Sequence, residues 1–237
     1  MISMEHYYRP HDQINGFTIV SVLGEGRYGI AYLAQDLFGH KYVIKQIKKK
    51  KRDRLSNEQN ILKSLHNSHF PLYVSGYYDG YSEGFIMEYK PGRVFEDLIL
   101  EDGWQFSRHE IIKITYQLLD ILLILHRMGI AHRDIRTPNV ILSPNGELVL
   151  IDFGLARFTD LSHQDTQEDY WYLGDFIRHL YYTNYHVYHH IDGRPWLKEL
   201  QLNTAEKRFL KRLLGMEIPY RSIYEIYEDL EELSLLP

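Results

Sequence analysis

The sequence of 237 residues contains no cysteine. This absence excludes disulfides, thiolate zinc sites, iron–sulfur clusters and cysteine nucleophiles. The sequence also lacks an excess of basic charge, since 27 Lys and Arg stand against 32 Asp and Glu and the formal net charge is −5. An electrostatic field that attracts nucleic acid or anionic lipid would be positive. We therefore expect no nucleic-acid partner.

Long apolar runs are missing as well. The most apolar stretch, residues 118–125, is interrupted by Asp120 and is far shorter than the ~18 residues that cross a bilayer. The first ten residues lack the apolar core of a secretory signal. These features predict a cytoplasmic protein without a membrane span.

The first ninety residues have the pattern of short strands, because β-branched and aromatic residues recur between Gly and Asp-Gly turns. Strands are predicted at residues 17–23, 30–34, 41–46, 72–78 and 85–89. One helix is predicted among them, at residues 55–65, with Ser56 as its cap.

Beyond residue 95 the apolar period becomes helical. A long helix is predicted at 110–128, entered through a capping box of Ser107 and Glu110 and ended by Gly129. Short strands at 140–142 and 148–151 flank a turn, and helix returns from Asp169 onward. A small β-rich part followed by a larger α-rich part is an α+β architecture.

Three glycines form a G-x-G-x-x-G pattern: Gly24, Gly26 and Gly29. The pattern alone is weak, because dinucleotide-binding folds share it and a plain hairpin turn also uses glycine. A dinucleotide fold would continue into a helix, with an acidic residue about 20 positions on. Here a strand follows in place of that helix, and lysines at residues 48–51 stand in place of that acidic residue. We expect these lysines to form a solvated loop.

Further motifs follow in a fixed order. Lys45 lies on the third strand and Glu58 comes thirteen positions later on the predicted helix; His132-Arg133-Asp134 has Asn139 five positions after its aspartate; and Asp152-Phe153-Gly154 follows a strand. With these motifs the sequence resembles the eukaryotic-type (Hanks-type) protein kinase family, from about residue 17 to 233. The resemblance implies a single two-lobed kinase-like domain over 1–237, with an N-lobe of 1–88 and a C-lobe of 89–237.

The resemblance implies ATP as co-substrate, Mg²⁺ as cofactor and a protein hydroxyl, Ser or Thr above all, as acceptor. Phosphoryl transfer needs positioning and electrostatic stabilisation. Lys45 would contact the phosphates, and Glu58 would hold Lys45 in place. Asn139 and Asp152 would bind Mg²⁺. Asp134 would orient the acceptor hydroxyl, with Arg136 beside it. The ATP contacts implied are Gly24, Gly26, Gly29, Ala31, Val43, Lys45, Met87, Glu88, Lys90 and Ile141, with adenine bonded to the backbone of Glu88 and Lys90.

Two departures from the family pattern matter. Arg136 replaces the lysine usual two positions after the aspartate, which weakens the preference for Ser/Thr over Tyr acceptors. Only eleven residues separate Arg157 from Asp169, without Ala-Pro-Glu, so Arg221 lacks its customary glutamate partner. Fully extended, eleven residues reach roughly 35–40 Å, with little slack for a switch. We expect Asp160 or Asp165 to give Arg133 a permanent negative partner in place of a phosphate.

Three functions remain open from the sequence. The intact motifs favour an active, minimal protein kinase of bacterial type. The shortened segment, which normally recognises peptides, keeps open a kinase for a small molecule such as a sugar, an antibiotic or a lipid headgroup. The third alternative is a catalytically silent nucleotide-binding regulator.

Overall fold

The computed structural model describes residues 6–26, 29–48, 52–160, 163–184 and 196–235, with 52–56 and 163 described by backbone alone. The chain forms two compact units. Met1–Pro91 and Phe153–Leu155 make the first, and Gly92–Asp152 and Ala156–Pro237 make the second.

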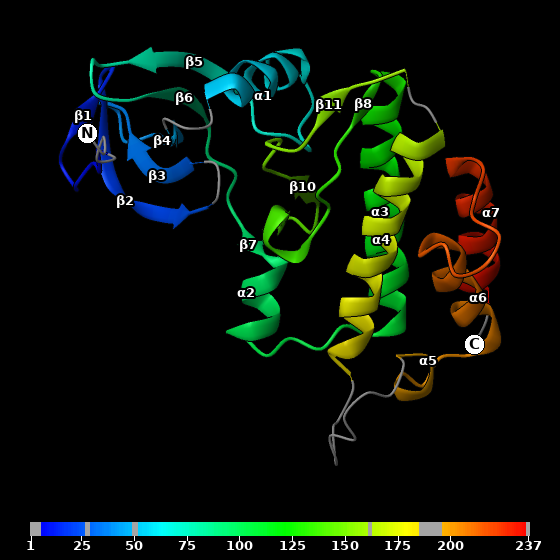
Figure 1. The fold of residues 1–237 in the computed structure, drawn as a ribbon. Helices are drawn as coiled ribbons and strands as arrows, with labels where there is room; N and C mark the ends of the chain where they lie inside the picture. Colours follow the sequence, from blue (N-terminus) through cyan, green and yellow to red (C-terminus); the bar gives the residue numbers. More distant parts are fainter. Residues whose placement is uncertain (1–5, 27–28, 49–51, 161–162, 185–195, 236–237) are drawn as a thin grey trace, which may run out of the picture. The chain divides into compact units, whose positions relative to one another are not determined.

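The first unit contains an antiparallel sheet of six strands in the order β1-β2-β3-β4-β6-β5 (blue to teal in Figure 1). All five predicted strands are present, with ends shifted by a few residues, and β1 was not predicted. The bounds are β1 (Gln13–Ile14), β2 (Phe17–Glu25), β3 (Gly29–Gln35), β4 (Lys41–Ile47), β5 (Tyr73–Tyr78) and β6 (Glu83–Glu88).

Alternate residues of β3 fill the core of this sheet. Ile30, Tyr32 and Ala34 are buried and belong to one cluster with Ile44 of β4 and Ile86 of β6. Successive side chains of a strand point to opposite faces. The residues between these, Ala31 on β3 and Lys45 on β4, therefore face away from the core and are opposite each other in register.

Helix α1 (Arg52–Ser64) begins three residues before the predicted start at 55. Ser56 consequently lies inside the helix, and its prediction as the N-cap is wrong. The reason is local: Arg52, Asp53 and Arg54 include no Gly or Pro to break a helix, and arginine has a high helix propensity. The C-terminal half of α1 packs inward through the buried Ile61 and Leu62.

The second unit is mainly helical. Its helices are α2 (Phe95–Leu100), α3 (Arg108–Arg127), α4 (His163–Tyr182), α5 (Trp196–Glu199), α6 (Thr204–Leu213) and α7 (Ile223–Ser234), with one 3₁₀ turn, η2 (Thr137–Asn139). Helices α3 and α4 lie side by side, α7 packs on α3, and α6 packs on α4 (Figure 1). Among the described residues, no helix is long and apolar enough to span a membrane.

Short strands carry the loops of this unit. Strands β9 (Val140–Leu142) and β10 (Leu148–Leu150) pair around the predicted turn, with β7 (Arg93–Val94) along β9, and β8 (Ile130–Ala131) pairs with β11 (Arg157–Phe158). Helix α3 has the predicted capping box, since the Glu110 amide donates to Ser107 and the Ser107 amide donates to Glu110. The predicted strands and cap of this unit are confirmed.

Helix α4 begins at His163, so the prediction that this helix starts at Asp169, after eleven connecting residues, is wrong. Six of those residues, 163–168, form the first turns of the helix, where each residue advances the chain by only 1.5 Å. Asp165 favours this earlier start because a carboxylate in the first turn complements the helix dipole. Helix α4 therefore includes six of the eleven residues that were predicted to connect Arg157 to it.

Candidate active site

The predicted site residues fall into two groups, one in each unit. In the first unit, the glycine-rich loop (residues 24–29) joins β2 to β3, and the Gly26 amide donates to the Gly29 carbonyl at 2.9 Å. A Cβ on Gly29 would lie 2.2 Å from the Gln46 carbonyl oxygen, so only glycine fits there. A Cβ on Gly24 or Gly26 would meet nothing within 4 Å, which leaves the loop open for a ligand. Arg27 and Tyr28 lie outside the described residues.

Lys45 and Glu58 form the predicted ion pair. The Lys45 ammonium lies 2.6 Å from Glu58 Oε1, and both side chains are almost fully buried, at 11% and 5% exposure. Strand β4 supplies the lysine and α1 the glutamate. Separating a buried ion pair leaves each charge uncompensated and costs free energy. The pair therefore keeps the Lys45 ammonium in this position.

The residues predicted to surround adenine lie on β3, on β4 and at the end of β6. The Glu88 amide donates to the Leu72 carbonyl at 2.8 Å, and the Glu88 carboxylate pairs with the Lys90 ammonium at 2.8 Å. The Glu88 N–H is therefore already occupied, and a nucleotide would meet other backbone groups of this stretch. The residues of this group in the first unit are Ala31, Val43, Met87, Glu88 and Lys90.

In the second unit the H-R-D loop (residues 132–139) leads from β8 to β9. Asp134 is buried, and its carboxylate accepts from Arg136 Nε at 2.5 Å, from Arg136 Nη2 at 2.9 Å and from Asn139 Nδ2 at 2.8 Å. The bond to Asp134 raises the pKa of Arg136 above its ordinary value, against the opposing effect of burial. Two donors thus fix the orientation of this carboxylate.

Asn139 and Asp152 are brought together by the backbone. The Ile151 amide donates to the Asn139 carbonyl at 2.9 Å, which places Asp152 next to the loop. Asn139 uses its amide NH₂ on Asp134, and its side-chain oxygen remains the group with which it can bind a cation. Asp152 has φ +63°, an uncommon backbone conformation outside glycine that often marks functional sites. Ile141 lies on β9.

One carboxylate oxygen and one amide oxygen fit Mg²⁺, which keeps waters and substrate phosphates among its ligands and seldom needs a full protein cage. The part of the chain that the structure describes contains no cluster of three or more His, Asp or Glu that could hold a metal ion.

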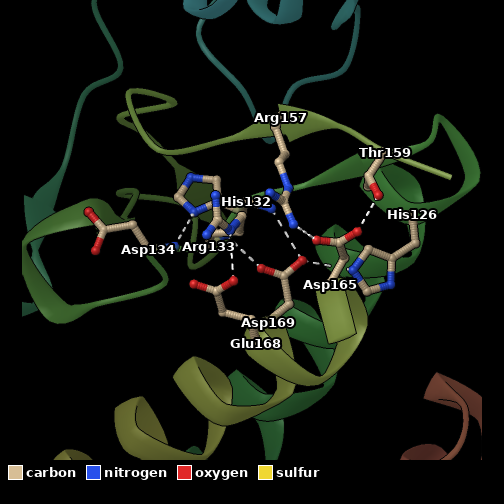
Figure 2. A network of polar contacts seen from close by, with 9 residues as sticks. All are labelled: His126, His132, Arg133, Asp134, Arg157, Thr159, Asp165, Glu168 and Asp169. Atoms are coloured by element: carbon tan, nitrogen blue, oxygen red, sulfur yellow. Dashed lines mark hydrogen bonds and ion pairs between the residues drawn. The ribbon is translucent and has the colours of Figure 1, made fainter. Parts of the chain in front are cut away.

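A buried carboxylate of α4 holds the H-R-D loop (Figure 2). Asp169 has no exposed surface, and its Oδ1 accepts from the Arg133 amide at 2.7 Å. Its Oδ2 accepts from the His132 amide at 3.2 Å and contacts His126 Nε2 at 2.8 Å. The sequence pattern predicted Asp169 only as the start of a helix and gave His126 no role. Asp169, Trp171 and Gly174 form a D-x-W-x-x-G pattern, which is the local signal that could have indicated this anchor.

Comparison with known proteins decides the family. The protein kinase domain model matches residues 17–185, which is more than half of the chain. The chain belongs to the protein kinase family. The predictions of a kinase and of its α+β, two-lobed fold are thereby confirmed.

Several relatives of this kinase have been named. A Bacillus subtilis protein named "Probable serine/threonine-protein kinase YbdM" is 33% identical over 226 residues, 90% of this chain and 88% of that one. The Schizosaccharomyces pombe serine/threonine-protein kinase ppk11 is 30% identical over 156 residues, 64% of this chain and 49% of its own. The Aurora/IPL1-related protein kinase 2 of Caenorhabditis elegans is 30% identical over 149 residues, 60% and 48%. The kinase spans most of the bacterial relative and about half of the two eukaryotic ones.

Arg133 of this kinase pairs directly with a carboxylate that the sequence did not predict. Its Nε lies 2.7 Å from Glu168, and this bond raises the pKa of Arg133. Asp165 accepts from Arg157 and from the Thr159 hydroxyl (Figure 2), and its negative charge adds to the rise in the pKa of Arg133. The predicted permanent negative charge near Arg133 is therefore present, and Glu168 supplies the ion pair because α4 starts early and its second turn brings Glu168 to the H-R-D loop.

His132 is fully buried beneath this network. The Asp134 amide donates to His132 Nδ1 at 3.3 Å, so this nitrogen carries no proton. Burial lowers the pKa of His132 from its ordinary 6.5, against the opposing pull of Asp169, Asp152 and Asp134. The imidazole is therefore neutral in the folded kinase and has a structural role.

We predict that His132 makes the kinase sensitive to acid. A histidine with a lowered folded pKa binds its proton more readily in the unfolded chain, so stability is present above pH 6.5 and falls as the pH drops below that value. The free energy of unfolding should therefore be lower at pH 5.5 than at pH 7.5. Urea unfolding of wild type and His132→Gln at both pH values should show a smaller pH dependence in the variant. Equal dependence in both proteins would contradict the assignment.

We also predict that no phosphate is needed on the segment before α4. The test replaces Thr159, Ser162 and Thr166 together by alanine; Ser162 lies outside the described residues. The initial rate of phosphoryl transfer by the phosphatase-treated variant should fall by less than about tenfold, which corresponds to ~1.4 kcal/mol of transition-state stabilisation. Glu168→Gln should lower the rate because Arg133 loses its anion, whereas Glu217→Gln, which removes an exposed ion pair with Lys211, should not. A larger loss in the triple variant would show that the segment is a phosphorylation switch.

Proposed function

We propose that this kinase transfers the γ-phosphoryl group of ATP, with Mg²⁺, to a serine or threonine hydroxyl of a protein. The observation that carries the proposal is Asp134, a buried carboxylate held by Arg136 and Asn139 on the loop that also adjoins Asp152. The name of the Bacillus subtilis relative, "Probable serine/threonine-protein kinase YbdM", supports this acceptor class.

Asp134 has room for an acceptor hydroxyl. A carboxylate oxygen can accept two hydrogen bonds, and Oδ1 of Asp134 accepts one, from Arg136 Nε, while Oδ2 accepts from both Arg136 and Asn139. The second position on Oδ1 would accept the proton of the incoming hydroxyl and orient its oxygen for attack. Arg136 holds the carboxylate still while this bond forms.

The remaining residues act on the nucleotide. Lys45, fixed by Glu58, would place its positive charge on the phosphates, and the glycine-rich loop would donate backbone N–H groups to them. Asn139 and Asp152 would hold Mg²⁺, which supplies neutralisation of the phosphate charge when it is bound. The cytoplasmic location and the absence of a nucleic-acid partner stay predictions from the sequence.

A small-molecule acceptor is the second candidate function, and the early start of α4 favours it. Six residues that would otherwise lie along a peptide are helical here. Labelled ATP with Mg²⁺, offered to the kinase alone and with a generic protein, separates the two candidates. Label on protein supports the proposal, and label only on added sugars or other small alcohols supports the alternative.

The role of Asp134 predicts a separation of binding from turnover. Asp134→Asn should leave the affinity for ATP nearly unchanged and lower kcat by roughly 10²-fold or more, the range for loss of a positioned acid–base group. Asp102→Asn, which changes an exposed carboxylate paired with Arg93, is the matched control and should retain full turnover. Parallel losses of ATP binding and turnover in Asp134→Asn would mean that the residue is structural.

The role of Asp152 predicts a metal effect. Asp152→Asn should abolish phosphoryl transfer, because the ligand loses the charge that binds Mg²⁺. The Mg²⁺ concentration that half-saturates ATP binding should rise in the variant, while binding of adenosine, which needs no metal, should not change. Undiminished turnover would refute the assignment of Asp152.

A further inference from the structure

The N-terminal segment at residues 6–12 precedes the part of the chain that the family model matches, which begins at 17. It is nevertheless built into the sheet of the first unit. Tyr8 is buried, and its hydroxyl contacts Asp79 and Ser82. Gln46 of β4 donates to the His6 carbonyl at 2.7 Å, so the segment is held on both sides of Tyr7.

From this position Tyr7 reaches the glycine-rich loop. Its hydroxyl lies 3.3 and 3.5 Å from the two carboxylate oxygens of Glu25, the residue between Gly24 and Gly26. Lys48 contacts the same loop, since its ammonium lies 2.6 Å from Glu25 Oε1 and donates to the Gly26 carbonyl at 2.9 Å. The bond to Lys48 lowers the pKa of Glu25. The sequence predicted that Lys48 lies in a solvated loop, whereas in the structure its ammonium contacts Glu25 and the Gly26 carbonyl.

Lys48 approaches the loop from the face opposite Lys45. The two lysines are three positions apart, and successive side chains of an extended chain alternate in direction. Gln46, which shares its direction with Lys48, is buried in the core and accepts from the Tyr32 hydroxyl at 3.0 Å. Lys45 instead meets Glu58 of α1. Lys48 is therefore placed to act on the loop and not beside Lys45 on the phosphates.

We propose that Lys48 and Tyr7 are positioning residues for the glycine-rich loop. They hold the Glu25 carboxylate and the Gly26 carbonyl on the face away from Lys45, so that the loop does not turn these two negative groups toward the phosphates. An unpaired Glu25 would repel the phosphates of the nucleotide. This inference rests on the proposed function, because it assumes that the loop binds ATP.

The test compares nucleotides with and without phosphate. In the full chain, Lys48→Met should raise the Kd for ATP about three- to fivefold, the effect of an exposed ion pair, and leave the Kd for adenosine unchanged. Adding Glu25→Gln to that variant should recover most of the loss, because the repelling charge is then gone. Tyr7→Phe should weaken ATP binding less than Lys48→Met, since it removes a neutral donor.

Lys48→Arg, which keeps the charge, should bind ATP like wild type, and Lys113→Met, at an exposed lysine of α3, controls for loss of a surface charge. Equal losses of affinity for ATP and for adenosine in Lys48→Met, or no recovery in the double variant, would overturn the inference. The proposed function would still stand if the wild-type kinase binds ATP and transfers its phosphoryl group. A wild-type kinase that binds adenosine no more weakly than ATP and transfers no phosphate would overturn both.

Discussion

The buried carboxylate of Asp169 is the interaction on which the second unit depends. A charge without exposed surface is stable only where hydrogen bonds replace water, and three donors from His126, His132 and Arg133 do so. Two of the three are backbone amides of the H-R-D loop. The same contacts hold Arg133 at φ +64°, a conformation that costs energy for a residue with a side chain. Asp134 follows Arg133 directly, so α4 helps to set the direction of Asp134 through the backbone of the H-R-D loop.

The first two turns of α4 join three parts of this unit. Asp165 contacts Arg157, Glu168 contacts Arg133, and Gln167 donates to the Tyr220 carbonyl at 2.5 Å in the loop before α7. Kinases of this family are expected to join the segment before this helix to an arginine near the C-terminus through a glutamate. Here the Gln167 amide makes that connection to a backbone oxygen, and Arg221 is left on the surface.

Local patterns predicted a large share of the molecule. The strands of the first unit, the capping box of α3 and the Lys45–Glu58 pair follow from spacing and propensity, which neighbouring residues determine. The start of α4 and the partner of Arg133 did not follow, because both depend on which polar side chains meet after folding. Asp165 and Glu168 are both acidic residues between Arg157 and Asp169, and only their positions on the turns of α4 decide which one reaches Arg133. The link from Tyr7 to Glu25 spans eighteen positions and has no local signal.

The pairing of β11 with β8 ties the segment before α4 to the chain that enters the H-R-D loop. Arg157 pairs with Ala131 and Phe158 with Ile130, and the Thr159 amide donates to the Gly129 carbonyl at 2.8 Å. Proteins open locally in roughly contiguous cooperative units. Opening of this ladder would therefore remove one of the two supports of the chain that carries Asp134 and leave Asp169 as the other, so that the precision of the site depends on the stability of this edge.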